Sequence, residues 1–204
     1  MQETVLSVDV GTTGCKVIAF SRQGETLYSS YAEYKTEVRQ GGICELNPEL
    51  VWNEVSRCLM DVASKDINIC AVAVSSLGEA AVLLDKEDNI LGNAILYNDF
   101  RGAGEMERLL DNELIAYIPI ATGQPVSYLH TLWKLVWISR NARKKHERIE
   151  RVLFFADYVV YKLTNRCVTD YSLAARSMAF NINTLSWDEK LVTLTGLDTA
   201  KFPE

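Results

Sequence analysis

A short turn rich in glycine and threonine, residues 9–16, constrains the fold of this chain more than any other stretch. It reads Asp-Val-Gly-Thr-Thr-Gly-Cys-Lys, and mostly apolar runs rich in β-branched residues flank it at 5–8 and 17–20. Because such runs around a glycine turn favour a hairpin, the pattern predicts two antiparallel strands. The common nucleotide-binding loops open a helix instead, and neither Gly-x-Gly-x-x-Gly nor Gly-x-x-x-x-Gly-Lys-Ser/Thr occurs here.

The residue types in this turn indicate phosphate binding. Gly11 and Gly14 are able to take backbone angles closed to other residues, and such a turn can direct several N–H groups at one anion. Thr12 and Thr13 add hydroxyl donors, and Lys16 adds a positive charge. The alternative that the residues leave open is an ordinary hairpin with a glycine turn.

Asp9 stands where the first predicted strand ends, directly before the turn. A carboxylate beside bound phosphates would repel a nucleotide unless a cation lay between them. Mg²⁺ prefers one or two carboxylates together with water and phosphate oxygens, which suits this position. The sequence therefore predicts Asp9 as a metal ligand.

Composition narrows the classes of partner. The chain has 204 residues, a formal charge of −6 and a pI near 5.1, which argues against a nucleic-acid-binding surface. No apolar run is long enough to span a bilayer, and the first residues lack the basic region of a signal peptide. The five cysteines are scattered and form no Cys-x-x-Cys pair, which favours reduced thiols in a cytoplasmic protein.

The segments after the hairpin extend the predicted sheet. A third strand is expected over 26–34, and Asn47-Pro48 is a good start for a helix that runs to about Ala63 with an apolar stripe. The run 69–75 is apolar throughout and predicts a fourth strand that is buried on both faces. A three-stranded antiparallel meander, a helix and a buried strand make the start of an α/β, ribonuclease H-like fold.

Polar side chains follow two further strand ends. Glu79 comes after the fourth strand, while Tyr97 and Asp99 close a predicted hairpin over 82–97. Loops after strands are where sites tend to be built in α/β proteins. A polyol needs carboxylate acceptors and an aromatic wall, and these three residues supply both types. Taken singly, each is also compatible with a turn or surface position.

Five blocks of sequence, in order, resemble the N-terminal domain of the FGGY family of carbohydrate kinases, which includes xylulokinases, gluconokinases and glycerol kinases. The family shares its ribonuclease H-like fold type with actin, hexokinase and Hsp70 chaperones. The blocks are 9–16, 45–52 (Glu-Leu-Asn-Pro-Glu-Leu-Val-Trp), 75–85, 94–101 (Ala-Ile-Leu-Tyr-Asn-Asp-Phe-Arg), and the weaker 157–164 with 169–172.

The resemblance implies roles for these residues. Asp9 would help to hold Mg²⁺, and the residues facing the ATP phosphates would be Gly11, Thr12, Thr13, Gly14 and Lys16. The residues reading the substrate hydroxyls would be Gly78, Glu79, Tyr97 and Asp99. Xylulokinases carry Met-His at positions 78 and 79 and glycerol kinases carry Arg-Glu, so the resemblance does not transfer a particular sugar.

The resemblance covers 1–204 as one N-terminal domain. In the family the catalytic base is an aspartate of a second domain, so no catalytic residue is assigned here and negligible turnover is expected from this part alone. The implied function is the N-terminal half of an ATP-dependent kinase that phosphorylates a hydroxyl of a sugar, sugar acid or polyol. Related kinases often pair, so a homodimer is a further expectation.

Two alternatives stay open from the sequence. One is a non-catalytic sugar-binding or regulatory module derived from such a kinase. The other is a nucleotide-switch ATPase of the actin or Hsp70 type, which shares the turn chemistry. The cluster of Glu79, Tyr97 and Asp99 argues against the second alternative, because such an ATPase has no need of a polyol pocket.

Overall fold

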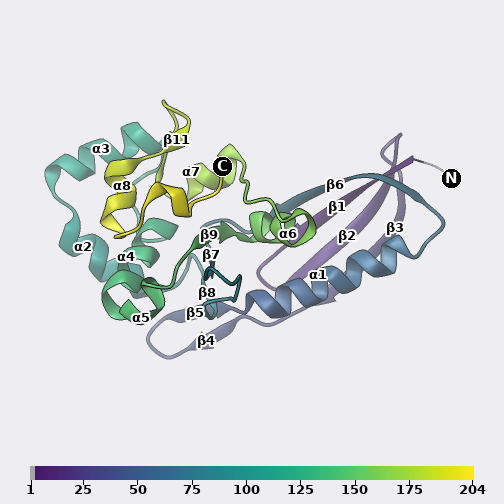
Figure 1. Cartoon of the computed structure of the whole chain (residues 1–204), viewed down its shortest axis with the longest axis horizontal. Coiled ribbons are helices and arrows are strands. Elements are labelled where there is room, and N and C mark those ends of the chain that lie inside the picture. The colour runs from purple at the N-terminus through teal and green to yellow at the C-terminus, as the bar shows by residue number, and fades with distance from the viewer. Residues whose placement is uncertain (1–2) are drawn as a thin grey trace.

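The computed structural model describes residues 3–204 and is built around one twisted four-stranded sheet (Figure 1). The strands lie in the order β3-β2-β1-β6 and comprise β1 (Glu3–Val10), β2 (Gly14–Ser21), β3 (Thr26–Glu33) and β6 (Asn68–Ser76). The pairs β1–β2 and β2–β3 are antiparallel, whereas β6 runs parallel to β1. The hairpin and the three-stranded meander predicted from the sequence are therefore confirmed.

Helix α1 (Pro48–Ala63) covers one face of this sheet and packs mainly over β2 and β3 (Figure 1). Its start is well capped, because the side chain of Asn47 accepts hydrogen bonds from the amides of Glu49 and Leu50. Val51 and Val55 are fully buried against alternate side chains of β1 and β2. The predicted helix and its end at Ala63 are confirmed.

The prediction that the strand over 69–75 is buried on both faces is wrong for the described residues. Most side chains of β6 are exposed, with Ile69 at 36% and Val72 at 43%. The reason is position, because β6 forms the edge of the sheet while α1 packs over β2 and β3. An apolar run is compatible with burial but does not specify which element covers it.

Two smaller sheets connect the large sheet to the rest of the chain. One consists of β4 (Glu37–Arg39), β5 (Ile43–Leu46) and β8 (Ala94–Ile95), and the other pairs β7 (Ala81–Leu84) with β9 (Arg151–Phe154). The predicted hairpin over 82–97 forms only close to its turn, where Leu84 and Ile90 make a bridge and the Leu91 amide donates to the Leu83 carbonyl oxygen at 2.8 Å. Gly92 has a φ of +80° and the chain then joins β8 to β5 instead.

The second half of the chain is mainly helical and gathers at the end of the molecule away from the N-terminus (Figure 1). Trp133 and Leu132 lie at the centre of its own hydrophobic core. No helix within 3–204 has the length and apolar character needed to cross a membrane. The remaining elements are η1 (Phe100–Gly102), α2 (Ala103–Leu109), α3 (Asn112–Thr122), α4 (Thr131–Asn141), α5 (Arg143–His146), α6 (Phe155–Thr164), α7 (Tyr171–Arg176), β10 (Phe180–Asn181), β11 (Ser186–Trp187), α8 (Glu189–Leu194) and η2 (Thr199–Lys201).

Candidate functional site

The glycine-threonine turn closes the β1–β2 hairpin as a tight, internally bonded bend. Asp9 pairs with Lys16 across the ladder, so a carboxylate and an ammonium group flank the turn. Inside it, the Gly11 amide donates to the Gly14 carbonyl oxygen at 2.8 Å. The turn thus brings Thr12 and Thr13 to the tip of the hairpin between two opposite charges.

Glycine is required at position 14 by packing rather than by backbone angle. A Cβ there would lie 2.6 Å from the Ala32 carbonyl oxygen and 2.7 Å from the Tyr31 hydroxyl oxygen, closer than real Cβ contacts allow. Neither Gly11 nor Gly14 is among the residues with a positive φ. The prediction that these two glycines supply backbone angles closed to other residues is therefore wrong. At Gly14, the close approach of β3 leaves no room for a side chain.

Asp9 and the segment before Glu79 meet at the same edge of the large sheet. Since β1 and β6 are parallel, their carboxyl ends lie together, and Asp9 is paired with Ser75. The Ser75 hydroxyl donates to Asp9 Oδ1 at 3.0 Å, and the Leu77 amide donates to the Val10 carbonyl oxygen at 2.8 Å. The turn and the chain leading to Glu79 are thus neighbours.

The surroundings of Asp9 fit a magnesium ion shared with phosphates. Asp9 is exposed, and its Oδ2 atom has no hydrogen-bond partner within 3–204. Over the same residues no group of three His, Cys, Asp or Glu side chains stands ready to hold a metal. A site with one carboxylate leaves the other positions to water and phosphate oxygens, which is the arrangement that Mg²⁺ prefers.

Glu79 lies buried in the connection between β6 and β7, with a φ of 57° that is unusual for a residue other than glycine. Its carboxylate forms an ion pair with the guanidinium of Arg176, at the end of α7. A Cβ at the neighbouring Gly78 would lie 3.8 Å from Arg176 Nε, so this arginine covers the space beside Gly78. Nothing in the sequence pattern indicates Arg176, because no motif links α7 to this connection.

Asp99 is fully buried, and both of its carboxylate oxygens accept hydrogen bonds from protein groups. Oδ1 accepts from the amide and Nε of Arg101, both at 2.9 Å, and Oδ2 accepts from Arg101 Nη2 and the Cys44 amide, both at 2.7 Å. Burial alone would raise the pKa of Asp99, but the hydrogen bonds from Arg101 and Cys44 outweigh it and hold that pKa below its ordinary value. Asp99 therefore ties the chain after β8 to β5.

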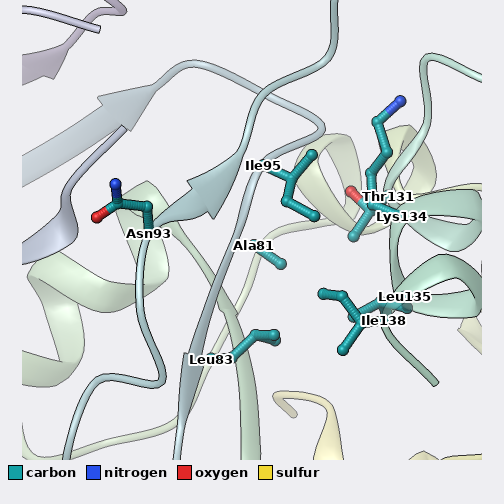
Figure 2. A pocket seen from close by; sticks show the side chains of 8 residues that line it. All are labelled: Ala81, Leu83, Asn93, Ile95, Thr131, Lys134, Leu135 and Ile138. Carbon is teal, nitrogen blue, oxygen red and sulfur yellow. The ribbon is translucent and has the colours of Figure 1, made fainter. Parts of the chain in front are cut away.

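Lys134 is a buried cation beneath the residues that follow β8. Its Nζ atom donates to the carbonyl oxygens of Asp99 at 2.8 Å, Tyr128 at 2.6 Å and Tyr97 at 3.4 Å. Figure 2 shows this amino group pointing away from Leu135 and Ile138, which line a cavity of about 10 Å³. Burial lowers the pKa of Lys134 to about 8. In the sequence, Lys134 could have been recognised as a charged residue among the apolar side chains of 129–141.

The two groups of predicted acceptor residues are linked through α4. His130 is buried and its Nδ1 atom lies 2.9 Å from the Arg176 carbonyl oxygen, while Lys134 lies one turn further along the helix. Burial lowers the pKa of His130, and Glu79 opposes that effect. Tyr97 is 44% exposed and its ring is free to line an open surface. The structure thus places Glu79 beside Arg176 and His130, and Asp99 beside Arg101 and Lys134.

Comparison with known proteins defines the class. The model of the FGGY family of carbohydrate kinases, N-terminal domain, matches residues 4–204. The chain belongs to this family. A glycerol kinase of Thermococcus kodakarensis is 33% identical over 212 residues, covering 100% of this chain and 42% of that protein. A xylulose kinase of Staphylococcus xylosus is 27% identical over 202 residues, covering 98% of this chain and 42% of that protein.

Solved structures confirm the predicted α/β fold class of the actin type. The gluconate kinase of Lactobacillus acidophilus superposes with a TM-score of 0.94 at 23% identity, covering 100% of this chain and 42% of that one. The glycerol kinase of Plasmodium falciparum, solved with ADP, superposes with a TM-score of 0.89 at 20% identity, covering 98% and 42%. The chain thus spans less than half the length of the relatives it matches.

Proposed function

We propose that residues 1–204 are the nucleotide- and acceptor-binding N-terminal domain of an ATP-dependent carbohydrate kinase. The observation that carries the proposal is the shared edge of the sheet, where the Leu77–Val10 hydrogen bond joins the turn to the chain leading to Glu79. A phosphoryl donor at the turn and a polyol at Glu79 would lie next to each other. That proximity is the main requirement for phosphoryl transfer.

On the nucleotide side, the turn would bind the phosphates of ATP. Gly11, Thr12, Thr13 and Gly14 would supply close backbone approach, amide donors and hydroxyl donors, and Lys16 a point charge. Asp9 would hold Mg²⁺ directly or through water. The bound ion would neutralise charge on the phosphate oxygens during transfer.

On the acceptor side, Glu79 would accept hydrogen bonds from substrate hydroxyls and Arg176, half exposed, would donate to their oxygens. Gly78 adds no side chain of its own next to this pair, and Tyr97 would offer its ring to the C–H face of a sugar. Asp99 has no oxygen without a protein partner, so its contribution is to hold the chain around Tyr97 in place.

The reaction would be an in-line attack of a substrate hydroxyl oxygen on the γ-phosphorus of ATP, breaking the bond to the β-γ bridging oxygen. The hydroxyl proton must pass to a base within hydrogen-bond distance. We assign no such base within 1–204 and propose that a second domain supplies it. The isolated chain would then bind both ligands with negligible turnover.

Calorimetric titration tests this function. The purified chain would be titrated with Mg-ATP and, separately, with glycerol, D-xylulose and D-gluconate, and a coupled assay would measure ADP release. We expect saturable binding of Mg-ATP and of at least one acceptor without turnover. Lys16→Ala should weaken Mg-ATP binding and Glu79→Gln acceptor binding, whereas the exposed Lys86→Ala and Glu87→Gln serve as matched controls. Absence of binding by all four ligands would contradict the proposal.

A further inference from the structure

Tyr34 lies just beyond β3 and donates hydrogen bonds to carbonyl groups of the glycine-threonine turn. Its hydroxyl oxygen lies 2.8 Å from the Gly11 carbonyl oxygen and 2.9 Å from that of Gly14. Its own amide donates to the Thr13 carbonyl oxygen at 3.1 Å. One residue thus contacts three carbonyl groups of the turn, from the side on which β3 packs.

The amide groups of the turn are disposed differently. Within 3–204, the N–H groups of Thr12 and Thr13 donate to no protein acceptor, and neither residue is buried. A peptide unit is planar and trans, so its N–H points away from its C=O. When the Gly11 carbonyl group is held toward Tyr34, the Thr12 N–H of the same peptide unit is therefore directed away from Tyr34.

Resting on the function proposed above, we propose that Tyr34 is a positioning residue for the nucleotide phosphates. It holds the carbonyl ends of the turn on the inner side and thereby keeps amide donors directed at the phosphate oxygens. The same contacts remove carbonyl oxygens, which would repel phosphate, from the binding side.

The environment of Tyr34 suits this task. The residue is 6% exposed, so the phenol is held by packing. Burial raises its pKa above the ordinary value, with Cys15 and Asp9 adding to the effect, so the hydroxyl stays a donor at neutral pH. The single hydroxyl proton serves both carbonyl oxygens, and the Gly11 amide gives the Gly14 oxygen a second donor.

The test compares Tyr34→Phe with Tyr28→Phe. Tyr28 lies in β3 and is 40% exposed, so it is a matched control for loss of a phenolic hydroxyl. Calorimetry of each variant with Mg-ATP should show about tenfold weaker binding for Tyr34→Phe, as expected for a lost orienting hydrogen bond. Acceptor affinity should stay unchanged in both variants, because Tyr34 contacts the turn and not the residues around Glu79. A general loss of structure would instead weaken the binding of both ligands.

Amide hydrogen exchange supplies the second measurement. In Tyr34→Phe the amides of Gly11 and residue 34, which donate to the Gly14 and Thr13 carbonyl oxygens, should exchange faster than in the parent, while those at the middle of β1 should not change. Equal Mg-ATP affinity and equal exchange in both variants would overturn the positioning role and leave the kinase proposal standing. Failure of the parent chain to bind Mg-ATP would instead overturn the nucleotide site itself, and the positioning role with it.

Discussion

The two halves of the candidate site are built in opposite ways. The glycine-threonine turn is held by neutral backbone groups and one phenol, all between Asp9 and Tyr34. The candidate acceptor region, around Glu79 and Asp99, is held by charged side chains that come from the β6–β7 connection, η1 and the residue before it, α4 and α7. The first is a local device, whereas the second exists only when distant parts of the chain are assembled.

This difference has energetic consequences. A lost hydrogen bond in the neutral turn costs about 1 kcal/mol, because water replaces much of it. A buried charge that loses its partner costs about 3–5 kcal/mol, because the remaining charge stays desolvated. The acceptor region should therefore be more sensitive to single substitutions and to pH than the turn. The following tests are arranged from the largest expected effect to the smallest.

Asp99→Ala should have the largest effect. It leaves the guanidinium of Arg101 without Asp99, although Glu45 still accepts from Arg101 Nη2 at 2.7 Å, and it leaves the Cys44 amide unpaired. We expect a loss of about 3–5 kcal/mol in the free energy of unfolding, measured by urea denaturation. Asp66→Ala, at an exposed position, should change it by less than about 0.5 kcal/mol. Similar values for both variants would mean that the charge network does not hold this region.

The pH dependence of stability should come next in size. Burial raises the pKa of Asp157 to about 7, and this residue sits next to Ala156, whose amide donates to Ser76 Oγ at the end of β6. Between the unfolded pKa of about 4 and pH 7, the folded state binds the extra proton. This group's contribution to stability is thus present below pH 4 and is lost as pH rises to 7, by on the order of 2–4 kcal/mol.

Asp157→Asn isolates that contribution. The difference between the unfolding free energies of the parent and this variant should fall by the amount given above as the pH rises from 4 to 7. Above pH 7 it should no longer change with pH. A difference that is independent of pH over this range would show that Asp157 is ionised in the folded protein throughout.

Gly14→Ala tests the turn itself. The new methyl group would lie 2.6 Å from the Ala32 carbonyl oxygen, so β3 must move away, at a cost of about 1–3 kcal/mol. Gly104→Ala is the control, since no atom lies within 4 Å of the place that its methyl group would take in α2 and helix propensity favours alanine by about 0.5–1 kcal/mol. Thermal denaturation should show a lower melting temperature than the parent for Gly14→Ala and a higher one for Gly104→Ala.

Arg176→Lys should have the smallest effect on stability but a selective effect on binding. Lysine keeps the charge beside Glu79 and loses the forked geometry, so acceptor affinity should fall about fivefold while Mg-ATP affinity is unchanged. Arg166→Lys, at an exposed position, should alter neither. If Arg176→Lys weakened the binding of both ligands equally, Arg176 would have a structural role and no specific role in acceptor binding.

Local sequence patterns determined a substantial part of this protein. The apolar runs on both sides of the glycine-threonine turn predicted the β1–β2 hairpin, and Asn47-Pro48 predicted the start of α1. The five blocks of sequence, one of which includes Glu79, indicated the family. These features depend on neighbours in the chain, where strand period, turn chemistry and capping act over a few residues.

The tertiary structure alone decided the rest. The exposed faces of β6, the packing reason for Gly14, the arginine facing Glu79 and the carbonyl groups held by Tyr34 all depend on contacts between elements far apart in the chain. Side-chain periodicity specifies which face of an element is apolar but not which partner meets it. Tertiary packing determines that partner. It brings the hairpin, the buried lysine and the arginine at the end of α7 together in one candidate site.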